Sequence, residues 1–113
     1  MDRRELKQQY KETEVLAGVF QIRNRQNGKI YLCSNMNLKV MNRQQFQLEL
    51  HSHPNKQLQH EWISDGKEAF VFEILETLSK EDRESLRAKD LLQKLEEKWL
   101  NQLQPFGERG YHV

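Results

Sequence analysis

Apolar and polar residues alternate over residues 18–23 (GVFQIR), the pattern of a strand with one buried face. Residues 24–28 (NRQNG) predict a turn, because Asn27-Gly28 supplies the positive φ angles of a tight hairpin. Residues 29–34 (KIYLCS) then predict the returning strand. Residues 69–75 (AFVFEIL) are aromatic and β-branched, so they predict a third strand, which we expect at the centre of the sheet.

Helical patterns fill most of the remaining chain. A helix is predicted over about 38–50, and a second, short helix follows Pro54 and includes Leu58 and Trp62. A single long helix is predicted from Ser79 to about Leu103, ended by Pro105 and Gly107. The residues placed to cap these three helices are Asn37, Asn55 and Ser79.

The order of elements predicts one α+β domain. Residues 1–14 form a polar segment with few apolar anchors, which predicts a short helix that needs docking to hold its shape. Residues 15–113 then form the main domain. The expected order is α-ββ-αα-β-α, a three-stranded antiparallel or mixed sheet flanked by helices.

Charge is distributed unevenly along this chain of 113 residues. The net charge is +1, which excludes a uniformly basic nucleic-acid protein. From Val15 to Leu48, however, there is no acidic residue. Two interpretations stay open: a surface that contacts phosphate, or ordinary solvated turn and strand positions. The basic residues of this stretch are Arg23, Arg25, Lys29, Lys39 and Arg43.

No apolar run approaches the length of a membrane span, and the N-terminus lacks the apolar stretch of a signal peptide. We therefore expect a cytoplasmic protein without a membrane partner. The single cysteine, Cys33, has no base partner visible in the sequence, and we expect it to act as a small buried apolar residue.

Glu96 occupies an unusual position on the last predicted helix. At about 100° per residue it falls inside an apolar arc that runs from Leu91 to Leu100, whereas Glu97 points toward solvent. A carboxylate on a packing face needs a cation or a hydrogen-bond donor. Either it is a boundary residue that pairs with a lysine, or it is a ligand for a hard cation such as Mg²⁺.

Three histidines, His51, His53 and His60, lie within ten residues of one another. Their spacing in a proline-containing loop does not match a regular zinc pattern. Their expected role is to supply polarity near the basic stretch.

Together these features resemble the GIY-YIG nuclease family, from Gly18 to about His112. The two naming tripeptides are matched by Gly18-Val19-Phe20 and Tyr31-Leu32-Cys33, one on each strand of the hairpin. Further matching segments are Asn37-Leu38-Lys39, Pro54-Asn55-Lys56-Gln57-Leu58, Phe72-Glu73-Ile74-Leu75, Leu95-Glu96, Trp99-Leu100 and Gly110-Tyr111-His112.

The resemblance implies metal-dependent cleavage of DNA phosphodiesters. It implies that Tyr31 is the second strand tyrosine and that Glu96 binds a single Mg²⁺ or Mn²⁺, weakly. The match is incomplete: Phe20 replaces the first tyrosine and Met41 the phosphate-binding arginine, and Arg43 is only a weak substitute because it points elsewhere on the helix. Cys33, Gln45 and His112 replace the expected glycine, histidine and asparagine.

These replacements predict a domain that binds DNA, with metal-dependent cleavage weak or lost. The alternative is a non-catalytic structural or protein-interaction domain derived from the nuclease fold.

Overall fold

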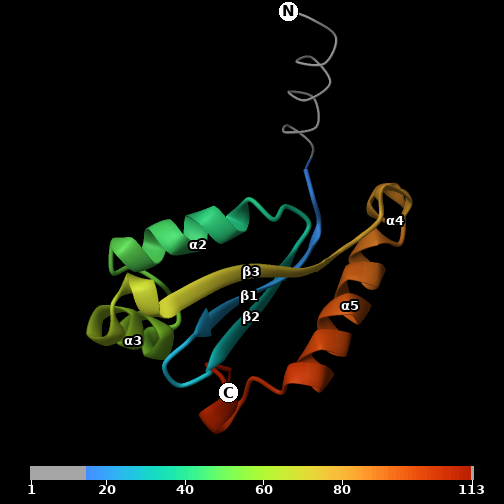
Figure 1. Ribbon diagram of the computed structural model, residues 1–113. Coiled ribbons are helices and arrows are strands. Elements are labelled where there is room, and N and C mark those ends of the chain that lie inside the picture. The colour runs from blue at the N-terminus through green and yellow to red at the C-terminus, as the bar shows by residue number, and fades with distance from the viewer. Residues whose placement is uncertain (1–14, 113) are drawn as a thin grey trace, which may run out of the picture.

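Three antiparallel strands form the centre of the molecule (Figure 1). The computed structural model describes residues 15–112, so the helix predicted over residues 1–14 lies outside the described residues. The strands are β1 (Gly18–Asn24), β2 (Ile30–Asn35) and β3 (Phe70–Thr77), in the order β2-β1-β3. The predicted α+β class is confirmed. The expectation that β3 is central is wrong, because β1 pairs with both other strands and β3 is left at an edge.

The predicted hairpin between β1 and β2 forms, but its turn is not the tight Asn27-Gly28 turn that was expected. In its turn, the Gly28 amide donates to the Asn24 carbonyl at 2.7 Å, and the Asn24 amide donates to the Lys29 carbonyl at 2.9 Å. Gly28 has a φ of 77°, while Asn27 keeps a negative φ, so the loop is longer than a two-residue turn. Across the hairpin, Phe20 lies opposite Cys33 and Ile22 opposite Tyr31.

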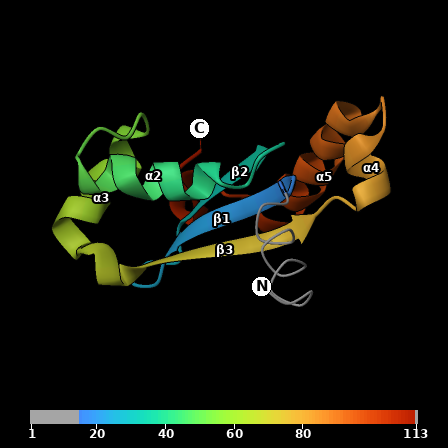
Figure 2. The same cartoon turned by 90° about the horizontal axis from the view of Figure 1, so that it is seen from above.

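The helices gather at the two ends of the sheet. Near the start of β3 lie α2 (Val40–Glu49), α3 (Lys56–Asp65) and a 3₁₀ turn, η1 (Lys67–Ala69). Near its end lie α4 (Lys80–Glu84) and α5 (Ala88–Leu103) (Figures 1 and 2). No helix within residues 15–112 is long and apolar enough to cross a membrane.

The single long helix expected from Ser79 is instead two helices. The predicted cap is present, because the Ser79 hydroxyl accepts from the Asp82 amide at 3.1 Å. Ser85 then adopts an extended backbone with ψ of 152°, and its hydroxyl accepts from the Arg87 amide at 3.0 Å. A serine side chain that bonds to nearby backbone competes with the helical bonds, and this interrupts the helix.

The main core lies between the sheet and helices α2 and α3. It is formed by large side chains from both layers and is joined by Tyr111 from the C-terminal tail. Its residues are Phe20, Ile22, Leu38, Leu48, Leu58, Trp62, Ala69, Phe70 and Tyr111. A smaller cluster under α5 contains Ala17, Leu78 and Leu92.

Gly18 permits a close approach between β1 and β3. A Cβ atom at this position would lie 2.2 Å from the Glu76 carbonyl oxygen, beside an irregularity in the strand register. Real Cβ atoms do not come that close to backbone, so a side chain here would push the two strands apart. Gly18 is therefore needed for packing.

Candidate functional site

Strand β2 directs Tyr31 and Cys33 to the same face of the sheet, because alternate strand residues share a face. Two histidines from distant segments enclose the Tyr31 ring. His53, which precedes α3, meets it edge-on with ring centroids 5.4 Å apart. His112, from the C-terminal tail, stacks on it at 5.1 Å with an interplanar angle of 7°. The tertiary fold thus builds a small aromatic site around one tyrosine.

A chain of hydrogen bonds links Asn55, His53, Gln44 and Cys33 beside Tyr31. The Asn55 amide donates to His53 Nδ1 at 3.0 Å, so the neutral imidazole carries its proton on Nε2. His53 Nε2 is 3.0 Å from Gln44 Oε1, and Gln44 Nε2 donates to the Cys33 sulfur at 3.4 Å. Both ring nitrogens of His53 are therefore occupied by bonds within the protein. This leaves His53 with no free nitrogen to act as a base.

Burial keeps the ionisable groups of this site in their neutral forms. It raises the pKa of Tyr31 to about 12, with a further contribution from Cys33. Burial also raises the pKa of Cys33 to about 11, against the lowering effect of its hydrogen bonds to Gln44 and Tyr31. It lowers the pKa of His53. The site at neutral pH thus holds a phenol, a thiol and an imidazole without charge.

The C-terminal tail closes the site along the free edge of β2. The Tyr111 amide donates to the Ile30 carbonyl at 3.0 Å, and the Leu32 amide donates to His112 Nε2 at 2.8 Å. Gly110 allows this approach, since a Cβ there would lie 2.1 Å from the Pro105 carbonyl oxygen. The imidazole of His112 therefore completes the hydrogen bonding of an edge strand.

Glu96 is half-buried on α5, while Glu97 is exposed, as the helical arc predicted. Among residues 15–112, no hydrogen bond or ion pair joins the Glu96 carboxylate to another side chain. The pairing with lysine considered from the sequence is therefore absent from the described part of the chain. Glu96 nevertheless acts electrostatically on Cys33 and His112, raising the pKa of both groups, so its charge is directed toward the aromatic site.

The two positions where the family resemblance implies catalytic groups, 20 and 41, hold apolar side chains. Phe20 is completely buried in the main core, opposite Cys33. Met41 lies in the first turn of α2, half-buried against the same core. Arg43 is exposed and lies roughly 200° around the helix from Met41, so it does not take that place.

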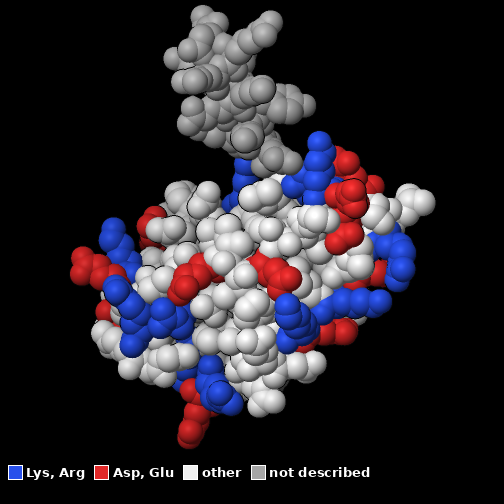
Figure 3. All heavy atoms as spheres, turned by 45° about the vertical axis from the view of Figure 1, so that its right-hand side comes forward, with Lys and Arg blue, Asp and Glu red and all other residues white. Residues whose placement is uncertain are grey.

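The five basic residues of the acid-free stretch do not form one patch. Arg23 pairs with Glu73 at 3.1 Å, and Arg25 donates to the Glu68 carbonyl. Lys29 lies 3.8 Å from the Glu61 carboxylate, beside the hairpin turn. At the opposite end of the hairpin, the exposed residues Lys39 and Arg43 line a hollow of about 150 Å³ together with Asn35, Asn37 and Val40. The face that includes α5 carries interspersed acids and bases (Figure 3).

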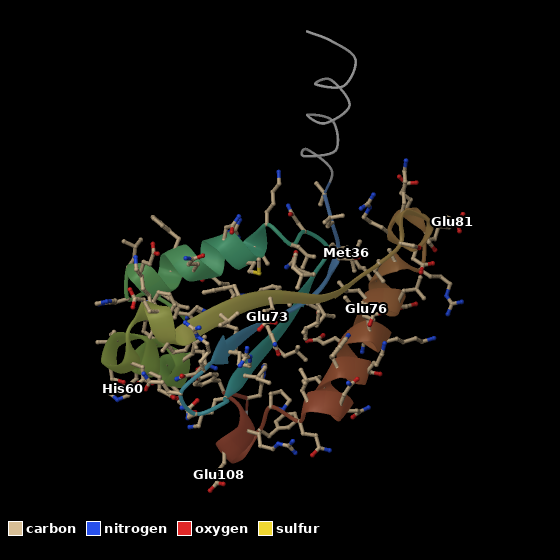
Figure 4. All side chains as sticks on the ribbon, in the orientation of Figure 1. Met36, His60, Glu73, Glu76, Glu81 and Glu108 are labelled. Carbon is tan, nitrogen blue, oxygen red and sulfur yellow. The ribbon has the colours of Figure 1, made fainter. Side chains whose placement is uncertain are left out.

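The three clustered histidines separate in space. His51 is exposed and His53 is buried. His60 is exposed on the outer side of α3 (Figure 4). No group of three or more histidine, cysteine or acidic side chains within residues 15–112 is arranged to hold a metal ion.

Sequence reasoning missed the importance of Gln44 and His53 and expected only loop polarity from the histidine. The available signal was the segment His53-Pro54-Asn55, in which a histidine stands two residues before a helix cap. An N-cap side chain fixes the chain entering a helix, so a polar group just before it is held in place.

Comparison with solved structures decides the family. The catalytic domain of the homing endonuclease I-TevI matches with a TM-score of 0.68 and 30% identity, over 86% of this chain and 97% of that one. The chain belongs to the GIY-YIG nuclease family. A point mutant of the same catalytic domain matches with a TM-score of 0.63 and 29% identity, over 79% of this chain and 84% of that one. No protein-family model matches the sequence, and no curated protein matches it.

Within the GIY-YIG fold, this chain retains the parts that pack. Gly18 and Gly110 stand where side chains would clash with backbone, and Tyr31 lies on β2. The Cys33 sulfur accepts a hydrogen bond from Gln44 on α2.

Proposed function

We propose that this GIY-YIG domain binds DNA and has weak or no phosphodiester cleavage. The observation that carries the proposal is the Glu96 carboxylate, which is half-buried without a partner among residues 15–112 and acts electrostatically on the site around Tyr31. A carboxylate in that setting is stabilised by a cation.

One divalent cation fits this arrangement. Glu96 would hold Mg²⁺ or Mn²⁺ together with water, because hard cations prefer oxygen ligands and Mg²⁺ often uses only one or two carboxylates. When bound, such an ion polarises phosphate oxygens and offsets the charge that develops in cleavage. A single carboxylate predicts weak binding.

The chain's own residues explain why cleavage would be slow. With a pKa of about 12, Tyr31 keeps its proton at neutral pH, so it can orient a water molecule by hydrogen bonding but is a poor proton acceptor. Phe20 supplies no hydroxyl, and Met41 supplies no charge for the phosphate. Losing one preorganised donor of this kind typically lowers a rate by about 10²–10³.

Binding to DNA would rest mainly on Lys39 and Arg43. They are exposed, and neither makes a side-chain bond or ion pair within residues 15–112. Arg23, Arg25 and Lys29 are each engaged with a protein group, which reduces what they can offer to phosphate.

The test is incubation of the purified protein with supercoiled plasmid and with oligonucleotides, in Mg²⁺ and in Mn²⁺. We expect DNA binding in both metals and slow nicking that Glu96→Gln abolishes. Glu97→Gln, one residue along the same helix but exposed, is the matched control and should behave as wild type. Thermal unfolding with each metal gives a second measurement, in which only Glu96→Gln should lose the stabilisation. If the metals stabilise all three proteins equally, the assignment of Glu96 as the metal ligand is wrong. If the protein does not bind DNA, the proposed function is wrong.

A non-catalytic interaction domain is the second candidate, and exposed apolar residues on α2 favour it. Phe46 lies on α2, and Leu50, four residues later, is the C-cap residue of that helix; their exposed fractions are 59% and 60%. Single exposed apolar residues are ordinary, but two on one helix face suggest a protein contact. If Phe46→Ser changes self-association or solubility while DNA binding is absent, this candidate is favoured over the first.

A further inference from the structure

Backbone groups of two other segments hold His112 in one orientation, one through its main-chain amide and one through its ring. Its amide donates to the Pro105 carbonyl at 3.1 Å, and its ring accepts from the Leu32 amide at 2.8 Å. The ring is also stacked on Tyr31 and meets Phe106 edge-on at 6.2 Å. An imidazole held by so many contacts has little freedom to turn.

The contact with Leu32 decides which nitrogen of His112 carries the proton. A backbone N–H can only donate, so Nε2 must be the acceptor, and the neutral ring then has its proton on Nδ1. Burial lowers the pKa of His112, and Glu96 opposes part of this effect. The lowered pKa favours the neutral ring at pH 7. Nδ1–H makes no hydrogen bond to any group within residues 15–112.

This protonation excludes two roles for His112. A protonated Nδ1 has no lone pair for a metal, and the lone pair of Nε2 is already used by Leu32. The ring therefore cannot bind a metal or accept a proton without breaking its contact with β2. The one donor left on the neutral ring is Nδ1–H, which no group within residues 15–112 accepts.

We propose that His112 donates from Nδ1 to a non-bridging oxygen of a DNA phosphate bound beside Tyr31. The inference rests on the proposed function and names a residue that contacts the substrate. The other candidates near Tyr31 are unsuitable: Met41 is apolar, and both ring nitrogens of His53 are occupied. His112 thus supplies a neutral donor to a site that has no arginine at position 41.

The first test uses the wild-type protein, so it does not depend on a variant that folds. Long-range ¹H–¹⁵N NMR of the histidine rings should show the proton of His112 on Nδ1 and that of His53 on Nε2. Titration with a short duplex oligonucleotide in EDTA should then shift the His112 Nδ1–H resonance. A proton on Nε2 of His112, or an Nδ1–H resonance that bound DNA leaves unchanged, would overturn the proposal.

The second test measures DNA affinity in EDTA by fluorescence anisotropy. His112→Phe keeps an aromatic ring on Tyr31 but removes the donor, and should weaken binding about ten- to a hundred-fold, the usual effect of losing a hydrogen bond to a charged group. His112→Asn keeps an N–H donor and should recover part of the loss. His60→Phe, an exposed histidine on α3, is the matched control and should bind as wild type.

The outcomes separate this inference from the proposed function. If wild type and His112→Phe bind DNA equally while charge reversal of Lys39 and Arg43 weakens binding, the function stands and the role of His112 is wrong. If wild type binds no DNA, the proposed function fails and the inference fails with it. Circular dichroism of each variant establishes folding, and the NMR titration of wild type decides the question if His112→Phe is unfolded.

Discussion

Replacing Met41 with arginine, together with Phe20→Tyr, would place a charge and a hydroxyl at the two positions where the family resemblance implies catalytic groups. Met41 lies in the first turn of α2, three residues before Gln44, whose side chain reaches Cys33. Residues three apart share a helix face, so an arginine at position 41 would start on the side of α2 that carries Gln44. We expect the double variant to cleave DNA faster than wild type.

The size of the gain follows from electrostatics. A preorganised cationic or hydrogen-bonding group that meets charge in the transition state is worth about 10²–10³ in rate, so Met41→Arg should supply most of the increase. The hydroxyl added by Phe20→Tyr should contribute less, because Tyr31 or a water molecule can cover part of its role. Single variants can show little, since residues that act as a unit are not additive.

The burial of Met41 and Phe20 also sets the loss in free energy of unfolding that the double variant should show. Met41 is half-buried, so losing its packing should cost about 1 kcal/mol, roughly half the value of a fully buried side chain. Phe20 is completely buried, and a new hydroxyl without a partner there costs about 1–3 kcal/mol. The sum lies below the ~5–15 kcal/mol stability typical of a domain, so the double variant should remain folded.

The assay is single-turnover nicking of supercoiled plasmid in Mg²⁺, after folding has been checked by circular dichroism. Met41→Lys is the matched control, because it adds the charge without the planar fork of arginine and should give a smaller gain. Adding Glu96→Gln to the double variant should abolish the gain. A folded double variant that remains inactive would refute the reasoning, and so would a wild type that already cuts as fast as the double variant.

Three further predictions concern stability and binding. Because the pKa of Tyr31 is raised to about 12 from an unfolded value of about 10, the folded state should lose stability as pH rises from 10 to 12, and Tyr31→Phe should flatten that loss in urea unfolding. Gly18→Ala should destabilise by about 3 kcal/mol or more, since its Cβ would lie 2.2 Å from the Glu76 carbonyl oxygen; thermal unfolding measures this. Reversing Lys39 and Arg43 to glutamate should reduce the slope of log affinity against log salt by up to about 1.8, and an unchanged slope would remove them from the interface.

Local sequence signals located most of the elements. Alternation and Asn-Gly predicted the hairpin, and Asn55 and Ser79 cap α3 and α4 as expected. These signals succeed because capping and strand alternation involve neighbours in the chain. The break at Ser85 was missed because its alternative bond to Arg87 has no distinctive pattern in the sequence.

The order of strands could not be obtained in the same way. Residues 69–75 are as apolar as a central strand, yet β3 is an edge strand whose inner face is covered by α2 and α3. Burial by helices and burial between two strands select the same residue types, so composition does not distinguish them.

The candidate site, too, was predictable only in part from the sequence, and the remainder depended on the tertiary structure. The sequence singled out Tyr31 from a motif and Glu96 from a helical arc, and it shows that positions 20 and 41 hold apolar residues. The roles of His53 and His112 were decided only by the fold, because the residue that fixes the proton of His112 lies 80 positions away, on β2. Local pattern determines which side chains a strand or helix presents; which nitrogen of a histidine remains free depends on a hydrogen-bond partner that only the folded chain brings within reach.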